Sequence, residues 1–251
     1  MTAEITPRTT HDEKIVAQFT RWAAPFSELA LHAEADGMRR TLAAADLSPD
    51  LRVLDVACGP GIVTCAVAKQ AGHVTGIDLT PAMIEQAKAR QAREAIANCD
   101  WQQGDATVLP FADASFDRAI TRYSFHHIPE PGRALKEMAR VTKPGGRVVV
   151  IDATPTAETQ GAYDAMETLR DPSHASALTL EQLRALGREA GLTETAFDFY
   201  RLDARLQTLA DEADMAALNT LFDTDIASGE DRIGVEARRD ADGIVFRFPV
   251  S

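Results

Sequence analysis

The chain of 251 residues is 45% hydrophobic and 25% charged, which is typical of a globular protein with one main core and predicts a single domain over residues 11–251. Its formal net charge of −12 argues against a nucleic-acid substrate, whose phosphates would be repelled. No apolar run approaches the ~18 residues of a membrane span, and the spacing of the cysteines suits neither a disulfide framework nor a metal site.

The first residues, 1–10, carry no apolar pattern and are predicted to form a disordered tail. They lack the basic start and apolar stretch of a secretory signal, so we expect a cytoplasmic protein. Within residues 11–48 apolar side chains recur at helical spacing, and Pro25 is expected to separate two helices. Because this segment precedes the first predicted strand, we expect it to cover a ligand site, with Phe19 and Phe26 touching the ligand.

A strand, a glycine turn and a helix follow. Residues 53–57 form an apolar run interrupted only by Asp55, which predicts a strand buried on both faces, and residues 62–70 have the pattern of a helix. Between them, Gly59 and Gly61 bring bare backbone N–H groups to the carboxyl edge of the sheet. This arrangement indicates a cofactor site.

The details of this turn favour one class of cofactor. A dinucleotide-binding motif needs a third glycine where the chain has Thr64, and Asp55 would repel a diphosphate. The carboxylate of Asp55 suits a ligand with an ammonium group instead.

The next two units also end in acids. Residues 74–78 predict a second strand that ends at Asp78, and Thr80 begins a helix that runs to about residue 95. An acid at this point binds ribose hydroxyls in nucleotide-binding folds. A third strand, 101–104, is followed by Asp105. Acids at the ends of three successive strands therefore predict one binding edge. The remaining units of this half are a strand at 115–121, a helix at 133–141, a turn at 143–146 and a fifth strand at 147–152.

These motifs, over about residues 50–152, resemble the class I S-adenosylmethionine (SAM)-dependent methyltransferases, and within them the type 11 group that includes the ubiquinone/menaquinone-biosynthesis C-methyltransferases. The resemblance implies an α/β, Rossmann-like fold with a seven-stranded, mostly parallel sheet, an antiparallel last strand and helices on both faces. It also implies SAM as the cofactor and S-adenosylhomocysteine as its product.

The resemblance further implies roles for individual residues. Asp55 would read the amino group of SAM, Asp78 the ribose hydroxyls, and Asp105 the exocyclic amine of the adenine. Leu79 and Met83 would pack against the adenine. The whole predicted cofactor-binding set is Phe19, Asp55, Ala57, Gly59, Gly61, Asp78, Leu79, Met83, Gly104, Asp105, Ala106 and Arg122.

Beyond residue 152 the resemblance weakens, and residues 153–251 are expected to supply substrate contacts and the final strands. The turn at 240–243 predicts a hairpin, and the last strand, 244–248, is expected to join the main sheet. The other expected elements are a helix at 179–190, a strand at 197–200 and an acidic helical insert over 206–226.

Catalysis of methyl transfer needs a donor and an acceptor held in line, and in some cases a base for the acceptor's proton. His126 and His127 follow the fourth strand, where the methionine end of SAM should lie, and His174 is a third candidate. Tyr123 and Asp152 also lie on this side of the sheet. Arg170 is expected to pair with an anionic substrate group or with its neighbour Asp171.

The sequence therefore predicts a SAM-dependent methyltransferase that acts on O, N or C of a small aromatic or heterocyclic metabolite by in-line displacement. Two alternatives stay open. One is a SAM-binding protein with other chemistry or a regulatory role, and the other is a nicotinamide-dependent oxidoreductase. No nucleic-acid partner, membrane or metal is expected, and the protein is predicted to be a monomer or homodimer.

Overall fold

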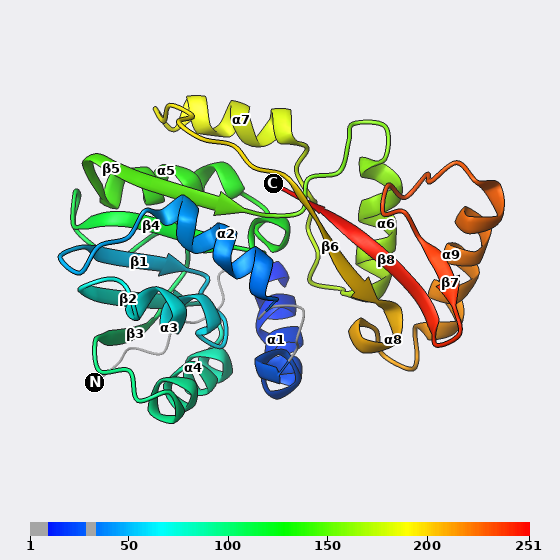
Figure 1. The fold of residues 1–251 in the computed structure, drawn as a ribbon, viewed down its shortest axis with the longest axis horizontal. Helices are drawn as coiled ribbons and strands as arrows, with labels where there is room; N and C mark the ends of the chain where they lie inside the picture. The colour runs from blue at the N-terminus through cyan, green and yellow to red at the C-terminus, as the bar shows by residue number, and fades with distance from the viewer. Residues whose placement is uncertain (1–9, 29–33) are drawn as a thin grey trace.

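The computed structural model describes residues 10–28 and 34–251, with the backbone alone for residues 24–28. Its centre is a five-stranded, fully parallel sheet in the order β3-β2-β1-β4-β5 (Figure 1). The strands are β1 Arg52–Val56, β2 His73–Asp78, β3 Cys99–Gln103, β4 Phe116–Arg122 and β5 Thr142–Ile151. The predicted α/β class is confirmed.

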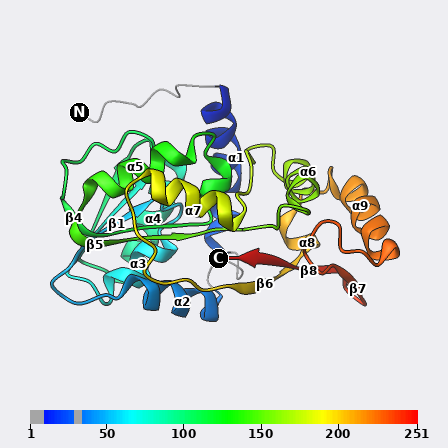
Figure 2. The same cartoon turned by 90° about the horizontal axis from the view of Figure 1, so that it is seen from above.

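Helices cover both faces of this sheet (Figure 2). Successive residues of β1 face opposite layers because strand side chains alternate. Val53 belongs to the apolar core on one face, whereas Leu54 and Val56 belong to the core on the other. The helices of the first face are α2 Ala35–Ala45, α3 Ile62–Ala68 and α4 Pro81–Arg93, and those of the second are α5 Pro131–Val141 and α7 Leu180–Glu189.

The prediction of seven strands in one sheet is wrong. A second, antiparallel sheet has the order β6-β8-β7, made of β6 Tyr200–Arg205, β8 Gly243–Val250 and β7 Arg238–Asp240. One edge of β8 pairs with β6, and β7 occupies the start of the other edge. Only the end of β8 therefore reaches the chain after β5, through the single bridge between Ala153 and Val250.

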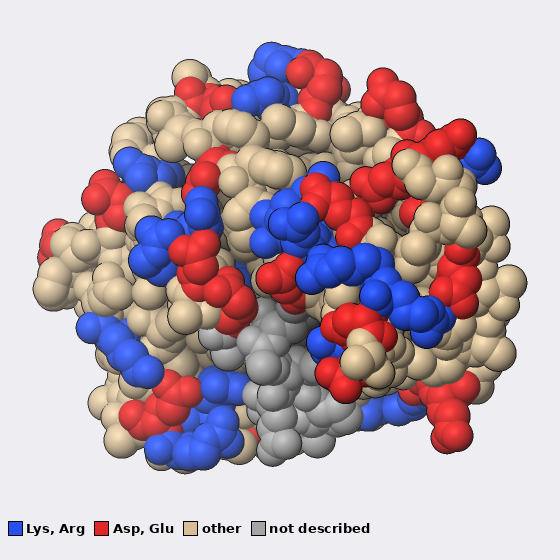
Figure 3. Space-filling view, turned by 45° about the vertical axis from the view of Figure 1, so that its right-hand side comes forward, with Lys and Arg blue, Asp and Glu red and all other residues tan. Residues whose placement is uncertain are grey.

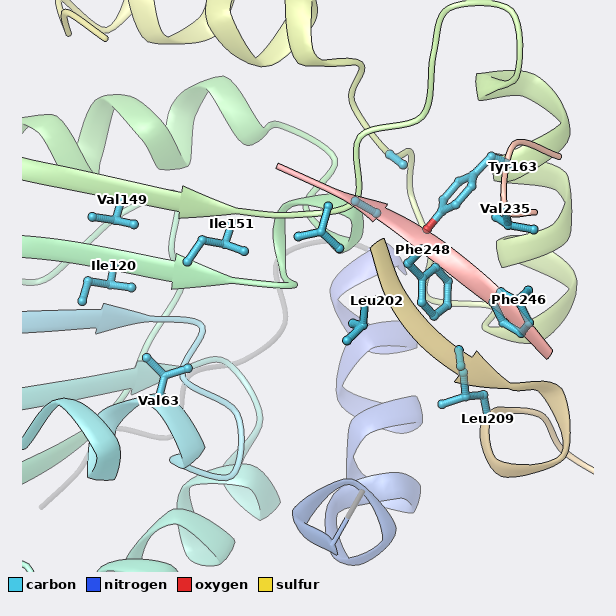
Figure 4. Close-up of a cluster of buried hydrophobic side chains, with 14 of the residues drawn as sticks. Val63, Ile120, Val149, Ile151, Tyr163, Leu202, Leu209, Val235, Phe246 and Phe248 are labelled. Atoms are coloured by element: carbon cyan, nitrogen blue, oxygen red, sulfur yellow. The ribbon is translucent and has the colours of Figure 1, made fainter. Parts of the chain in front are cut away.

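The second sheet carries its own helices and aromatic core. Helices α6 Gln160–Arg170, α8 Leu206–Leu209 and α9 Met215–Ser228 belong to this half of the molecule (Figure 1). Phe246 lies between Phe222 and Phe248, with ring centroids 5.1 and 4.9 Å away (Figure 4). The predicted helical insert over 206–226 and the hairpin at 240–243 are both present.

Two local predictions need correction. Helix α1 runs from Thr10 to Glu28 and passes through Pro25. A proline has no N–H group to donate to the carbonyl oxygen four residues earlier, so the helix loses one backbone hydrogen bond. Because Pro25 lies close to the end of α1, this loss is confined to the end of the helix. The predicted strand at 197–200 is also wrong, because the strand begins only at Tyr200; Phe197 and Phe199 are 50% and 45% exposed. The predicted tail, except for Thr10, and the side chain of Phe26 lie outside the described residues.

Acidic and basic side chains are interspersed on the face seen in Figure 3. The described residues form many ion pairs, for example Arg205 with Asp240 at 2.8 Å and Arg40 with Asp198 at 2.6 Å. Within residues 10–28 and 34–251, no helix combines the length and the apolarity needed to cross a bilayer. The single-domain organisation and the absence of a nucleic-acid partner stay predictions.

We expect Gly61→Ala to destabilise the fold. Gly61 has φ 76°, and a Cβ atom there would lie 2.6 Å from Cη2 of Trp101. Strain and overpacking together should lower the free energy of unfolding by about 2–4 kcal/mol, measured by urea denaturation. The matched control is Gly187→Ala in α7, where a Cβ meets no atom within 4 Å. It should be neutral or stabilising by about 0.5–1 kcal/mol, and equal stabilities of the two variants would contradict this account.

Candidate functional site

A cavity of about 310 Å³ lies at the carboxyl ends of β1, β2, β3 and β4. Helix α1 closes one side with Asp12, Ile15 and Phe19, which share one face of the helix because they are three and four residues apart. Of the predicted cofactor-binding set, all but Asp55 and Gly61 line this cavity: Phe19, Ala57, Gly59, Asp78, Leu79, Met83, Gly104, Asp105, Ala106 and Arg122.

The turn after β1 is shaped by a hydrogen bond to the end of β2. The Gly59 N–H donates to Oδ2 of Asp78 at 2.8 Å, and the Thr80 N–H donates to Oδ1 at 2.8 Å. Gly59 has φ 52°, and no atom lies within 4 Å of the place where a Cβ would be. Burial raises the pKa of Asp78. The result is a fixed carboxylate beside an open backbone cradle.

The third strand supplies the opposite end of the cavity. Oδ1 of Asp105 accepts hydrogen bonds from the backbone N–H and the hydroxyl of Thr107, at 2.7 and 2.8 Å. Gly104 must lack a side chain, because a Cβ would lie 2.5 Å from Cδ1 of Ile77. Met83, 2% exposed, presents an apolar surface between Asp78 and Asp105 along the lining.

Asp55 and Gly61, the other two members of the predicted cofactor-binding set, do not line the cavity, and their part in binding the cofactor stays a prediction. Asp55 is buried under the turn, where its Oδ2 accepts a 2.5 Å hydrogen bond from the Thr64 hydroxyl. Burial raises the pKa of Asp55 to about 7. Gly61 faces Trp101 and Ala87, so its role in the structure is close packing between α3, α4 and β3.

The end of β4 contributes a cation and a phenol to the cavity wall. The Arg122 guanidinium lies 4.4 Å from the centroid of the Tyr123 ring, and its Nη2 donates to the Tyr123 hydroxyl at 3.1 Å. The Tyr123 hydroxyl also shares a 2.7 Å hydrogen bond with that of Tyr200 in β6. Tyr123 has a φ of 56°, which is a strained backbone conformation for a residue other than glycine. Strain of this kind clusters at functional sites.

Asp152, directly after β5, organises the loop that follows β4. Its Oδ2 accepts the backbone N–H groups of Ser124, Phe125 and His126 at 3.1, 2.6 and 3.3 Å. Its Oδ1 lies 2.5 Å from Nδ1 of His126. Burial disfavours a charged ring, but the carboxylate outweighs burial and raises the pKa of His126 above 6.5. Because Nδ1 donates to Asp152, Nε2 is the ring atom left to accept a proton.

His127 has the opposite character. The Ser173 hydroxyl donates to Asp171 at 2.6 Å, so Nδ1 of His127 is the donor toward Ser173, at 3.2 Å from its carbonyl oxygen. Burial, together with the neighbouring His126, lowers the pKa of His127 to about 3. The ring is therefore neutral near pH 7, and Phe19 meets it edge-on with ring centroids 4.9 Å apart.

His174 and Arg170 lie farther from the cofactor cavity. His174 is buried, its Nε2 lies 2.8 Å from Oδ1 of Asp164, and it lines neither cavity described here. The guanidinium of Arg170 pairs with Glu167 at 2.6 and 2.9 Å, so the predicted pairing with Asp171 is wrong. The helix explains the pairing, because residues three apart share one face.

A second cavity, of about 60 Å³, lies where the parallel sheet meets α6, β6 and β8. Tyr123 and His127 line both cavities, so the two cavities adjoin at these residues. His126, Tyr163, Glu167 and Arg170 are its other polar residues, and the remainder of the wall is apolar.

Sequence reasoning missed several cavity residues. Asp12 and Ile15 could have been found from Phe19, because they occupy the same helical face. Glu130 and Arg133, at the start of α5, gave no signal beyond their charge. Nor did Tyr163, on α6, whose place in a cavity depends on how the second sheet packs.

Comparison with protein families gives a match to the methyltransferase domain over residues 54–150. An uncharacterised methyltransferase of Bacillus subtilis, YcgJ, is 31% identical over 170 residues, which cover 67% of each chain. A ubiquinone/menaquinone biosynthesis C-methyltransferase of Ruegeria is 40% identical over 121 residues. The match covers 46% of the present chain and 48% of that relative, so the chain spans about half of its length.

The fold agrees with these relatives. The crystal structure of Bacillus subtilis YcgJ superposes with a TM-score of 0.78 at 25% sequence identity. The superposition covers 86% of the present chain and 95% of YcgJ.

The buried carboxyl of Asp55 predicts a pH-dependent stability. Its pKa is about 7 in the folded chain, against an ordinary value of 3.8, so the folded protein holds a proton that the unfolded chain releases. The free energy of unfolding should therefore fall by about 2–4 kcal/mol from this group as the pH rises from about 4 to 7. In Asp55→Asn the free energy of unfolding should no longer show this decrease with pH, whereas the exposed control Asp100→Asn should show the same decrease as wild type. Urea denaturation at pH 5 and pH 8 measures the difference; the same fall in wild type and Asp55→Asn would contradict it.

Proposed function

The chain belongs to the class I SAM-dependent methyltransferases, and we propose that it transfers the methyl group of SAM to O, N or C of a small aromatic or heterocyclic metabolite. S-adenosylhomocysteine is the other product. The observation that carries the proposal is the 310 Å³ cavity, which has the carboxylates of Asp78 and Asp105 at the ends of neighbouring strands. Membership of this family excludes the nicotinamide-dependent alternative.

The residues of the cavity fit SAM. The open position beside Gly59 gives room for a ligand to approach the backbone closely. We assign the two ribose hydroxyls to Asp78, since each of its oxygens keeps a lone pair after accepting one N–H. Asp105 is assigned to the adenine amine, and Phe19, on α1, to the cover over the bound cofactor.

In this proposal Asp55 influences the bound cofactor without touching it. It lies under the glycine turn and accepts a hydrogen bond from Thr64, so the charge that it carries above its pKa of about 7 reaches the cavity through the protein and not by contact. Bound SAM supplies a methyl group on a positively charged sulfonium, which is already reactive toward a nucleophile. A carboxylate below the turn favours that positive charge.

Two adjacent histidines, His126 and His127, follow the end of β4, and their different environments suit them to different roles. A general base works best when its pKa lies near the operating pH. The pKa of about 3 makes His127 a poor proton acceptor, and we assign it to the wall of the site. His126, whose pKa Asp152 raises, is the base that we propose for acceptors with a proton to lose.

The name of the Ruegeria relative, a C-methyltransferase of ubiquinone/menaquinone biosynthesis, supports a small-molecule acceptor. The apolar residues in the wall of the second cavity, which include Leu202, Leu209 and Phe248, suit an acceptor with little net charge. A SAM-binding protein without methyl transfer would bind the cofactor equally well. Turnover of methyl-labelled SAM with a panel of small phenols, indoles and quinols therefore tests the proposal, and binding without turnover of any panel member would oppose it.

Asp78→Ala should weaken SAM binding by about 1–3 kcal/mol, because charge-assisted hydrogen bonds to the ribose are lost. Isothermal titration with SAM, S-adenosylhomocysteine and NAD measures the affinities. The matched control is Asp100→Ala, on β3, whose side chain is 74% exposed. Unchanged affinity in a folded Asp78→Ala protein would show that the cofactor lies elsewhere.

The His126 base predicts a pH profile. The neutral ring accepts the proton, so kcat/KM should rise with pH up to a pKa above 6.5. His126→Gln should lower kcat by ~100-fold or more and flatten this profile, with SAM affinity within about twofold of wild type. The control is His73→Gln, a partly exposed histidine paired with Asp100. A His126→Gln enzyme with the wild-type profile would exclude this base.

A further inference from the structure

We propose that the second cavity is the acceptor chamber, and that it takes the neutral edge of an acceptor carrying a hydroxyl group next to a second oxygen. The inference rests on the proposed function and specifies its substrate class. It starts from the place where the cavities adjoin: Tyr123 and His127 line both of them, so groups in the two cavities approach each other beside these side chains. A methyl donor in the first cavity and an acceptor in the second meet there.

The proton-accepting side of the chamber is His126. Its Nδ1 is fixed by Asp152 at 2.5 Å, and His126 lines the second cavity and not the first. An acceptor that gives its proton to Nε2 must therefore reach into the second cavity. A hydroxyl group fits this requirement.

The donor side of the chamber is Tyr163. This residue is 2% exposed and lines the cavity, and its hydroxyl has no hydrogen-bond partner among the residues that the structure describes. Figure 4 shows the ring extending from α6 toward Phe248, with the hydroxyl at its far end. Burial raises the pKa of Tyr163, so the hydroxyl keeps its proton. A buried donor of this kind calls for an acceptor oxygen on the ligand.

Arg170 adds donors on the same side. Five N–H groups project from a guanidinium, and Glu167 takes one from Nε and one from Nη2. Its further partner among the described residues is the Leu209 carbonyl, at 3.4 Å from Nη1. The guanidinium of Arg170 therefore has further N–H groups that can donate to an oxygen of a ligand in the cavity.

The charges of the chamber favour a neutral ligand. Glu167 and Arg170, the two charged side chains of the wall, are paired with each other and so already have their counterions. A carboxylate on the acceptor would face Glu167, and an ammonium would face Arg170. Burial of an unpaired charge is costly, so acceptors that carry a carboxylate and acceptors that carry an ammonium group are both disfavoured.

The size of the chamber sets a further limit. A cavity that binds benzene has about 150 Å³, whereas this one has about 60 Å³. It therefore receives the reacting edge of an acceptor and not a complete ring. In the reaction the hydroxyl proton moves to Nε2 of His126 and the acceptor oxygen bonds to the methyl carbon. The carbon–sulfur bond breaks and leaves its electron pair on sulfur, and His126 then returns its proton to solvent.

The test uses catechol, in which two oxygens are adjacent, with hydroquinone and benzoate for comparison. We expect catechol to bind the S-adenosylhomocysteine complex in ligand-observed NMR, to be methylated with labelled SAM, and to be preferred at least ~10-fold in kcat/KM over hydroquinone. Benzoate should not bind. Lack of catechol binding to a protein that binds SAM would overturn the chamber but not the proposed function, whereas lack of SAM binding would overturn both.

Two variants place the acceptor. Tyr163→Phe removes one hydroxyl and should raise KM for catechol ~5-fold, with kcat within about twofold, because one hydrogen bond is lost. Ala153→Val adds two methyl groups to the chamber wall and should lower kcat/KM for catechol by ~10-fold or more; the matched control, Ala196→Val on an exposed position, should not. Both variants should bind SAM with wild-type affinity. Wild-type kinetics in both would overturn the proposal.

Discussion

One buried residue, Asp152, connects the two halves of this molecule, the first through its carboxylate and the second through its backbone. It gathers three consecutive N–H groups of the loop after β4, and it also fixes the ring of His126. Its own backbone exchanges two 3.0 Å hydrogen bonds with Ser251, next to the end of β8. A buried carboxylate must be satisfied by such donors, which fixes the loop and the histidine, and the backbone bonds of the same residue attach the end of the second sheet beside them.

The parallel half of the fold could be predicted from local patterns. Apolar runs that end in acids or glycines mark buried strands, and parallel strands bring their carboxyl ends to one edge. Asp78 and Asp105 follow this rule and line the cavity. Asp55 does not, because it lies within β1 and not at its end, and its side chain turns beneath the glycine loop toward Thr64. The spacing of the acids along the chain predicts which edge of the sheet binds a ligand, but it does not predict the direction in which each side chain points.

The second half depends on contacts that no local pattern records. The prediction that β8 would join the main sheet failed because β7 competes for the same edge. Adjacent histidines also differ for long-range reasons. His126 meets Asp152 and His127 meets Ser173, partners that lie far along the chain and shift the two pKa values in opposite directions. The sequence alone left the two residues equivalent.

The single bridge between the sheets has an evolutionary consequence. The cofactor side is built from loops of the parallel sheet, and the smaller cavity takes much of its wall from α6, β6 and β8. Substitutions in that outer half change the wall of the smaller cavity and leave in place the strand ends that line the larger one. If the smaller cavity receives the acceptor, as we propose, the outer half is the natural target for laboratory evolution of selectivity.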